Sequence, residues 1–315
     1  MPRLSAMLAS VIAIGLCVLA AVPLDAFEWD SRIVGGSNAT GNVCPHAVAI
    51  RLVGQNFLCN GALISNQDVL TAAQCVYNGN VVRNASEFQI VLGSLANSNS
   101  SAGSTLRSVS AVWVHPSYVS SARLNNVAVL RLNATVQNAT SLTPVQLSTS
   151  ASAVNQTCTL CGWGANSTTG SALATLQRLD VTIQSSNSTY CTRANGNATL
   201  VADQICAGDL AAGRGACNRD EGAPLVCSTR LHGVLTIVGG CGAVNETSIF
   251  LNTVTHRDWI NNRTQTQVSG GGTGGTGTGG TGTGGGGGGA SQVVMQIWIV
   301  MMPIVVSLAL KHGTN

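Results

Sequence analysis

The most informative segment of the sequence, residues 217–227, reads Cys217-Asn218-Arg219-Asp220-Glu221-Gly222-Ala223-Pro224-Leu225-Val226-Cys227. It places three consecutive charged residues between two cysteines, in a chain of which only 9% is charged. Five further short blocks accompany it in one order along the chain: Arg32-Ile33-Val34-Gly35-Gly36, Leu70-Thr71-Ala72-Ala73-Gln74-Cys75, Asn125-Asn126-Val127-Ala128-Val129-Leu130 and Cys161-Gly162-Trp163-Gly164 before it, and Asp258-Trp259-Ile260 after it. An ordered set of blocks is far more specific than any single motif.

Short apolar or alternating runs recur between clusters of glycine, asparagine and serine. They cover residues 47–53, 61–63, 89–92, 108–114, 127–132, 176–183, 233–238 and 249–254. Such runs are typical of β-strands, and no helices alternate with them. One helix is expected over 255–261, with Trp259 and Ile260 on the same side. The pattern predicts an all-β fold, either a sandwich or a pair of barrels.

The beginning of the chain predicts export from the cell. Residues 1–26 place one positive charge before a short apolar run, which is typical of a secretory signal peptide. Residues 27–32 would then be a short propeptide, and the folded domain would occupy 33–264.

The end of the chain predicts attachment to a membrane. Residues 265–292 form an expected flexible tether, because their 270–289 portion holds 15 glycines and 5 threonines and nothing else. The apolar segment in 293–315 fits the signal for a GPI anchor, and a single transmembrane helix is the alternative. Either attachment would hold the domain on the extracellular face of the plasma membrane.

Composition excludes several classes of protein. A formal net charge of +3 is too weak for a nucleic-acid-binding surface. Of 11 cysteines, the ten beyond the leader predict disulfides, and none has the spacing of a zinc site, so we expect neither metal nor cofactor. Eleven Asn-x-Ser/Thr sequons predict heavy glycosylation, at Asn38, Asn84, Asn99, Asn133, Asn138, Asn155, Asn166, Asn187, Asn197, Asn245 and Asn262.

Taken together, the blocks resemble those of the chymotrypsin- and trypsin-like (S1) serine proteases, over residues 33–262. The resemblance implies two six-stranded antiparallel β-barrels with a cleft between them and a short C-terminal helix. Arg32-Ile33 resembles the activation junction of this family, where cleavage frees an isoleucine amine that inserts beside a buried aspartate, here Asp220. Asp220 is retained either for this switch or for packing alone, and the sequence leaves both open.

The residues at the three triad positions depart from the family. Gln74 stands in place of the histidine, Asn126 in place of the aspartate and Glu221 in place of the nucleophilic serine. A carboxamide cannot act as a general base near neutral pH, and a carboxylate offers no hydroxyl nucleophile. The resemblance therefore implies a serine protease homologue without peptidase activity. Four histidines fall outside the matching blocks and are not expected to rebuild a triad: His46, His115, His232 and His256.

The oxyanion hole and the specificity pocket are also altered. Arg219 stands where the family has an oxyanion-hole glycine, so its side chain would close the hole or project into the cleft. Its proximity in sequence to Glu221 also gives the hypothesis of a salt bridge between the two. The pocket floor falls at Gly215, so no acid is present there to bind a Lys or Arg side chain. Thr236 and Val238 fall on the pocket wall, and Val238 in place of glycine narrows the entrance to a small apolar side chain at most.

The resemblance also implies the disulfides Cys59–Cys75, Cys158–Cys227, Cys191–Cys206 and Cys217–Cys241. Cys44 and Cys161 match no bridge that is usual in the family, and we expect them to pair with each other.

Three functions are compatible with these sequence features. The first is a non-catalytic homologue at the cell surface that binds a protease or a substrate of an extracellular proteolytic or innate-immune cascade, or a surface ligand. The second is an adhesion or receptor module that uses the barrels as a platform. The third is a serine-type endopeptidase with non-standard residual activity.

Overall fold

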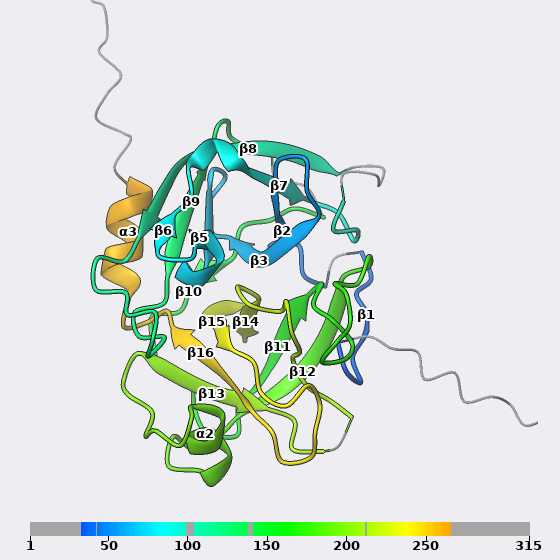
Figure 1. Cartoon of the computed structure of the whole chain (residues 1–315), viewed down its shortest axis with the longest axis vertical. Helices are drawn as coiled ribbons and strands as arrows, with labels where there is room; N and C mark the ends of the chain where they lie inside the picture. Colours follow the sequence, from blue (N-terminus) through cyan, green and yellow to red (C-terminus); the bar gives the residue numbers. More distant parts are fainter. Residues whose placement is uncertain (1–32, 42, 99–103, 138–140, 212, 266–315) are drawn as a thin grey trace, which may run out of the picture. The chain divides into compact units, whose positions relative to one another are not determined.

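Twelve strands form two closed β-barrels in the computed structural model (Figure 1). The structure describes residues 33–265 except 42, 99–103, 138–140 and 212, and it does not describe the side chains of Arg193 and Gln265. The first barrel lies in the upper part of Figure 1 and the second in the lower part.

The first barrel closes in the order β2-β3-β4-β9-β8-β7, with every neighbouring pair antiparallel. Its strands are β2 (Ala47–Leu52), β3 (Phe57–Leu63), β4 (Asp68–Thr71), β7 (Phe88–Leu92), β8 (Thr105–Val114) and β9 (Ala128–Leu132). The second barrel runs β12-β11-β14-β15-β16-β13 and closes through the β12–β13 pair. Its strands are β11 (Thr157–Gly162), β12 (Gln177–Ile183), β13 (Gln204–Gly208), β14 (Pro224–Cys227), β15 (Arg230–Ile237) and β16 (Ser248–Asn252).

Short strands and helices lie outside the two barrels. β1 (Ser37–Asn38) pairs with β12, β10 (Gln146–Leu147) pairs in parallel with β15, and β5 (Tyr77–Asn78) forms a hairpin with β6 (Val81–Val82). The helices are η1 (Ala73–Val76), η2 (Ala85–Glu87), α2 (Thr189–Ala194) and α3 (Arg257–Gln265).

The predicted architecture is confirmed: two six-stranded antiparallel β-barrels followed by a short C-terminal helix. Four barrel strands (β4, β11, β13 and β14) and helix α2 were not predicted from the sequence. These strands are only four to six residues long, and in β4, β13 and β14 nearly every position is buried. They therefore show little of the polar–apolar alternation that indicates a strand.

Helix α3 begins later and ends later than the expected 255–261. The Thr255 hydroxyl donates to the carbonyl of Asn252 at 2.8 Å, which keeps this residue in the turn before the helix. At the other end, the buried Arg131 guanidinium donates to the carbonyls of Arg263 and Thr264, both at 3.1 Å. Because the last carbonyls of a helix have no partner within it, this side chain on β9 extends α3 by supplying donors.

Each barrel encloses its own apolar core. The core of the first barrel includes Phe88 and Leu130, and Ile260 of α3 packs into the same cluster. The core of the second barrel includes Leu160, Phe250 and Ile33, the residue that follows the expected activation junction. The polar contacts between the two barrels, at the level of β3 and the 217–223 segment, position the candidate site.

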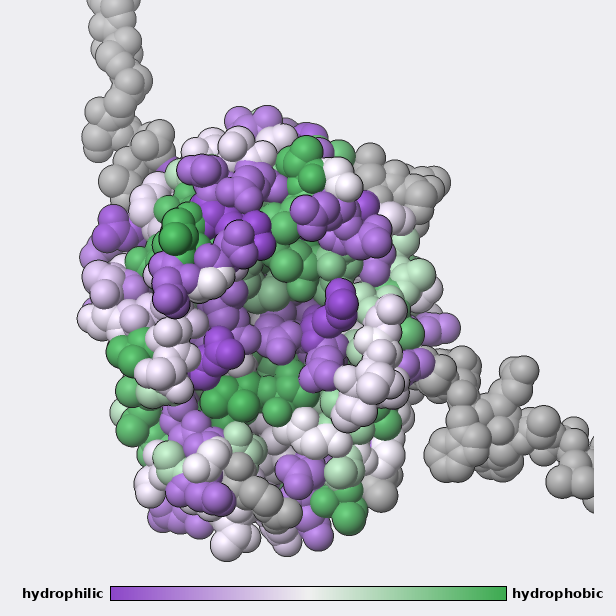
Figure 2. All heavy atoms as spheres, in the orientation of Figure 1, coloured by the Kyte–Doolittle hydropathy of each residue, from purple (hydrophilic) through white to green (hydrophobic). Residues whose placement is uncertain are grey.

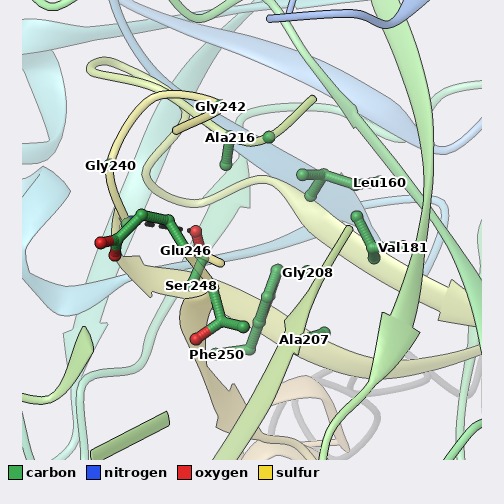
Figure 3. Close-up of a pocket in the computed structure, with 13 residues that line it drawn as sticks. Leu160, Val181, Ala207, Gly208, Ala216, Gly240, Gly242, Glu246, Ser248 and Phe250 are labelled. Atoms are coloured by element: carbon green, nitrogen blue, oxygen red, sulfur yellow. Dashed lines mark hydrogen bonds between the residues drawn. The ribbon is translucent and has the colours of Figure 1, made fainter. Parts of the chain in front are cut away.

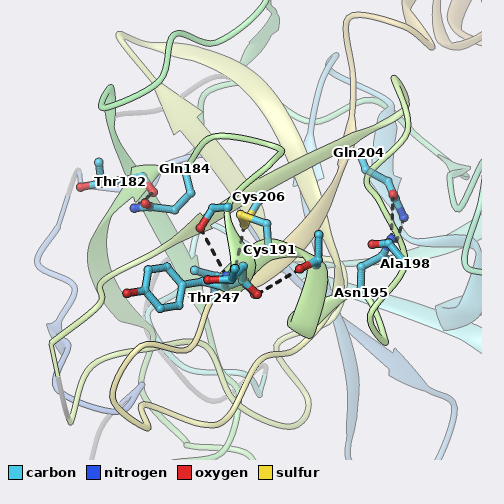
Figure 4. The surroundings of a disulfide bond; sticks show 12 residues. Thr182, Gln184, Cys191, Asn195, Ala198, Gln204, Cys206 and Thr247 are labelled. Atoms are coloured by element: carbon cyan, nitrogen blue, oxygen red, sulfur yellow. Dashed lines mark hydrogen bonds between the residues drawn. A yellow bond between two sulfur atoms is a disulfide. The ribbon is translucent and has the colours of Figure 1, made fainter.

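Five disulfides cross-link the fold, in the same pairs that were expected from the sequence: Cys44–Cys161, Cys59–Cys75, Cys158–Cys227, Cys191–Cys206 and Cys217–Cys241. Figure 4 shows Cys191–Cys206, which joins α2 to β13. Beside it, the Thr247 hydroxyl donates to the carbonyl of Tyr190 at 3.1 Å. This bond fixes the loop before β16 against α2.

Among the described residues, no helix is both long and apolar enough to cross a membrane. The expected signal peptide (1–26), the propeptide (27–32) and the C-terminal apolar segment (293–315) lie outside the described residues, as does the expected tether (265–292) after Gln265.

Candidate functional site

Gln74 and Asn126 form a reciprocal hydrogen-bonded pair between η1 and the start of β9. The Asn126 Nδ2 donates to Gln74 Oε1 at 2.7 Å, and the backbone N–H of Gln74 donates to Asn126 Oδ1 at 3.1 Å. The Arg123 guanidinium donates to the same Gln74 Oε1 at 3.0 Å. Asn126 is fully buried, so its amide is held in one orientation. Neither carboxamide gains or loses a proton near neutral pH, so neither can act as a general base there.

Glu221 is half-buried and follows Asp220 in the 217–223 segment. Its backbone carbonyl accepts hydrogen bonds from the Asn60 N–H at 3.0 Å and from Asn60 Nδ2 at 3.3 Å. Its carboxylate has no hydrogen bond or ion pair with any residue that the structure describes. The charge of Glu221 is therefore available to a ligand.

The expected salt bridge between Arg219 and Glu221 does not form. Arg219 adopts a φ of 72°, is exposed, and forms no ion pair with any described residue. Its side chain lines a shallow groove beside the β2–β3 turn, with Gly54 and Phe57 among the other lining residues. Arg219 thus lies beside the first barrel, with its backbone in the left-handed conformation that glycine adopts most readily.

Asn60 on β3 is a site residue that was not predicted from the sequence. It is buried, and its Nδ2 donates to the carbonyl of Arg219 at 2.9 Å while its Oδ1 accepts the backbone N–H of Trp163 at 3.0 Å. One side chain of the first barrel thus holds two separate segments of the second. Only the placement of an amide in an otherwise apolar strand could have indicated this role.

Asp220 is completely buried beside Gly164 and Cys217. Its Oδ1 accepts the Gly164 N–H and its Oδ2 accepts the Cys217 N–H, both at 2.9 Å. Burial raises the pKa of this carboxyl from 3.8 to about 7, despite the two hydrogen bonds, and the nearby charge of Glu221 adds a smaller upward contribution. A carboxylate at this position lacks a cation among the described residues.

Ile33 is buried in the second barrel, and Val34 is bound to the segment that precedes Cys217. The backbone N–H of Gly215 donates to the carbonyl of Val34 at 2.9 Å. Gly164 leaves no room for a side chain, since a Cβ there would lie 2.2 Å from the Asp220 carboxyl. Arg32, the third residue of the expected activation site, lies outside the described residues.

The pocket at Gly215 is almost filled (Figure 3). It leaves about 10 Å³ for the centre of a water molecule, which is room for about one water. Ser248 and Phe250 of β16 line it together with Gly215, as do Leu160 and Val181 of the second barrel. A side chain larger than a methyl group would have to displace these walls.

Two expected wall residues are not part of this pocket. Thr236 is buried and its hydroxyl donates to the carbonyl of Ile249 at 3.0 Å, so it supports β16 from behind. Val238 packs against the core of the second barrel. Ser248 and Phe250 were not predicted as wall residues because they lie on a different strand from the recognisable sequence blocks.

None of the four described histidines forms a hydrogen bond or ion pair with Gln74 or Glu221. His115 and His256 pack edge to face, with ring centroids 5.2 Å apart, and His256 Nε2 lies 3.1 Å from Asn125 Oδ1. Burial lowers the pKa of His46 to about 4, and it also lowers the pKa of His232. No histidine contacts a carboxylate and a hydroxyl in the arrangement of a relocated triad, among the residues that the structure describes.

Polar residues gather across the middle of the face in Figure 2, between hydrophobic side chains of the barrels above and below. Within the described ranges, no group of three His, Cys, Asp or Glu residues is arranged to hold a metal ion.

Asn99 and Asn138 lie outside those ranges, and the other nine sequon asparagines are exposed or half-exposed: Asn38, Asn84, Asn133, Asn155, Asn166, Asn187, Asn197, Asn245 and Asn262. Glycans at these nine positions would need no rearrangement of the core.

Comparisons with known proteins agree with this fold. The family model described as trypsin matches residues 33–260. The serine protease SP24D of Anopheles gambiae is 34% identical over 70% of this chain and 76% of its own length. Trypsin II-P29 of Gallus gallus is 29% identical over 78% of this chain and 94% of its own length. The structure of mouse neuropsin, a serine protease, superimposes with a TM-score of 0.64 at 25% identity, covering 73% of this chain and 99% of that one.

Proposed function

The chain belongs to the trypsin family of serine proteases, and we propose that it is a member without peptidase activity that binds another extracellular protein. The observation that carries the proposal is the bonding of Gln74, whose Oε1 accepts hydrogen bonds from Asn126 and from Arg123. Peptide hydrolysis in this family needs an imidazole that takes a proton from a serine hydroxyl. On the family pattern, Gln74 and Glu221 stand at those two positions.

The size of the expected loss supports a binding role over weak catalysis. Removing a single triad member lowers kcat by about 10⁴- to 10⁶-fold in proteases that use this triad. Here all three positions carry other residues, and the carboxylate of Glu221 would repel a developing oxyanion. The nearly filled pocket at Gly215 adds a second obstacle, because it has no room for a large substrate side chain.

The cleft keeps features that suit a protein ligand. Arg219 and Glu221 carry opposite charges, and neither is paired with a described residue. Unpaired charges of both signs beside a groove favour recognition of a partner surface with complementary charges. We propose that this partner is a protease or a protease substrate of an extracellular cascade, with the chain attached to the outer face of the plasma membrane through a GPI anchor.

Peptidase activity of the full-length protein, cut after Arg32, tests the proposal. The parent is assayed on a peptide library beside a variant with Gln74→His, Asn126→Asp, Arg219→Gly and Glu221→Ser. A matched control carries the first three changes with Glu221→Ala. We expect a silent parent, a silent control and turnover by the variant; turnover by the parent that a serine-directed inhibitor abolishes would contradict the proposal.

Capture experiments address the partner and the anchor separately. Cross-linking on cells followed by identification of bound proteins should recover a protease or its substrate. Recovery of an adhesion ligand alone would favour the receptor-module alternative. Treatment of the same cells with a phospholipase that cleaves GPI anchors should release the protein, whereas retention would point to a transmembrane helix.

A further inference from the structure

A separate cavity lies where the segment before β2 meets β11, β14 and the β14–β15 turn. It has a volume of about 540 Å³, which is in the range of small-molecule sites. It shares no lining residue with the pocket at Gly215. Its apolar walls come from the segment before β2, the segment before β10, and β14: Val43, Pro45, Pro144, Val145 and Val226.

His46 provides a polar group inside this cavity. The residue is 8% exposed, and its side chain has no hydrogen bond to any described residue. Burial lowers the pKa of its imidazole to about 4, so the ring is neutral near pH 7 and offers one donor and one acceptor. A buried imidazole without a protein partner is satisfied by a ligand or by water.

Arg230 is the one charged residue among the described residues that line the cavity. It is exposed at the β14–β15 turn and forms no ion pair within the described ranges. One carboxylate, that of Asp180, is hydrogen-bonded to a residue that lines the cavity: the Thr159 hydroxyl donates to it at 2.8 Å. This carboxylate already forms an ion pair with Arg178 at 2.8 Å. The charge of Arg230 is therefore not neutralised by this carboxylate.

A second cavity of about 410 Å³ adjoins the first, because Gln146 and Arg230 line both. It adds Arg257 and Asp258 at the start of α3, neither of which forms an ion pair with a described residue. The charged residues of the two cavities together are two arginines and one aspartate. The shared rim therefore favours an anion.

We propose that these adjoining cavities bind a small organic carboxylate with an apolar body. The carboxylate would pair with Arg230, the apolar body would lie against the valine and proline walls, and His46 would hydrogen-bond a polar substituent. Guanidinium–carboxylate pairs are among the strongest polar contacts in proteins, whereas a neutral ligand would gain the apolar contacts and a hydrogen bond to His46 but no ion pair with Arg230. This site does not depend on whether the cleft is catalytic.

Fluorine NMR of 4-fluorophenylacetate with the full-length protein tests the proposal. We expect saturable line broadening with the carboxylate and much weaker broadening with its neutral analogue, 4-fluorophenethyl alcohol. Arg230→Gln should weaken binding of the carboxylate by about tenfold or more. Arg51→Gln removes the same charge from β2, outside both cavities, and should leave binding unchanged.

A second variant tests binding by blocking the cavities, and its melting temperature shows that the protein is still folded. Gln146→Trp places a large side chain at an exposed position shared by both cavities, and should abolish binding while the melting temperature is kept. Arg230→Lys should retain part of the affinity. Absence of carboxylate binding, equal binding of the neutral analogue, or equal affinity in the Arg230→Gln and Arg51→Gln proteins would each overturn the proposal.

Discussion

Asn126 and Gln74 satisfy each other through two hydrogen bonds, one from side chain to side chain at 2.7 Å and one from backbone to side chain at 3.1 Å. The pair closes the junction between η1 and β9 at the centre of the cleft. It is neutral, and the one nearby charge that contacts it among the described residues is the Arg123 guanidinium. Neither side chain of the pair titrates near neutral pH, so the pair orders this part of the cleft without supplying a general base.

Asn126→Ala should destabilise the fold by about 1–3 kcal/mol, because it removes a fully buried amide and leaves the Gln74 backbone N–H without its partner. The free energy of unfolding in denaturant measures the effect. Asn78→Ala on the exposed hairpin strand β5 is the matched control and should change stability by less than about 0.5 kcal/mol. Equal stability of the two variants would mean that the pair contributes nothing to the fold.

Asn60→Ala should destabilise the fold by about 2–4 kcal/mol, since it removes the contacts to Arg219, Glu221 and Trp163 together. Asn60→Asp keeps an acceptor for the Trp163 N–H but loses both donated bonds, and it places a charge beside two carbonyl oxygens. We therefore expect Asn60→Asp to be no more stable than Asn60→Ala in thermal unfolding. A stable Asn60→Asp protein would contradict this account of how β3 holds the 217–223 segment.

The barrel pair was predictable from sequence because several blocks that resemble those of one family occur in one order along the chain. Strand β4 was not predictable in the same way. Its sequence Asp68-Val69-Leu70-Thr71 has polar residues at both ends and buries all four. Asp68 is buried because it pairs with Arg131 at 2.9 Å, a contact between residues 63 positions apart that no local pattern contains.

In the candidate site, the residues inside the recognisable blocks were predictable and the residues outside them were not. Gln74, Asn126 and Glu221 were found because they lie inside recognisable blocks. Asn60, Arg123 and Ser248 lie outside them, and their roles depend on how distant strands are brought together. The position of Arg219 beside the β2–β3 turn could not be predicted either, because it depends on how the two barrels are brought together. Proximity in sequence to Glu221 suggested an ion pair that the geometry does not form.

Removal of Cys44–Cys161 should lower stability more than removal of Cys191–Cys206. The first bridge closes a loop with a sequence separation of 117 and the second a loop with a separation of 15. In the chain-entropy model such loops contribute roughly 5 and 3 kcal/mol. Calorimetry of the two double Cys→Ser proteins should therefore show the lower melting temperature for the Cys44/Cys161 pair, and the reverse order would reject the entropic explanation.

Asp220 should make the uncut chain less stable as pH rises. Its pKa is raised from 3.8 to about 7 by burial, so between these values the folded chain holds a proton that the unfolded chain has lost. The contribution of Asp220 to the free energy of unfolding therefore falls from about pH 4 to about pH 7 and is constant above it. Because other carboxylates titrate in the same range, the quantity to measure is the difference between the parent and Asp220→Asn.

Cleavage after Arg32 should abolish this trend if the new Ile33 ammonium reaches Asp220. The ammonium would hold the carboxylate charged and lower its pKa below the ordinary value of 3.8, so the contribution of Asp220 would no longer fall between about pH 4 and pH 7 and would be lost only in more acidic solution. An Arg32→Gln chain exposed to the same protease should keep the behaviour of the uncut parent. A cut parent that still loses stability with rising pH would show that Asp220 is buried for packing alone, because a charged carboxylate paired with an ammonium cannot take up a proton at neutral pH.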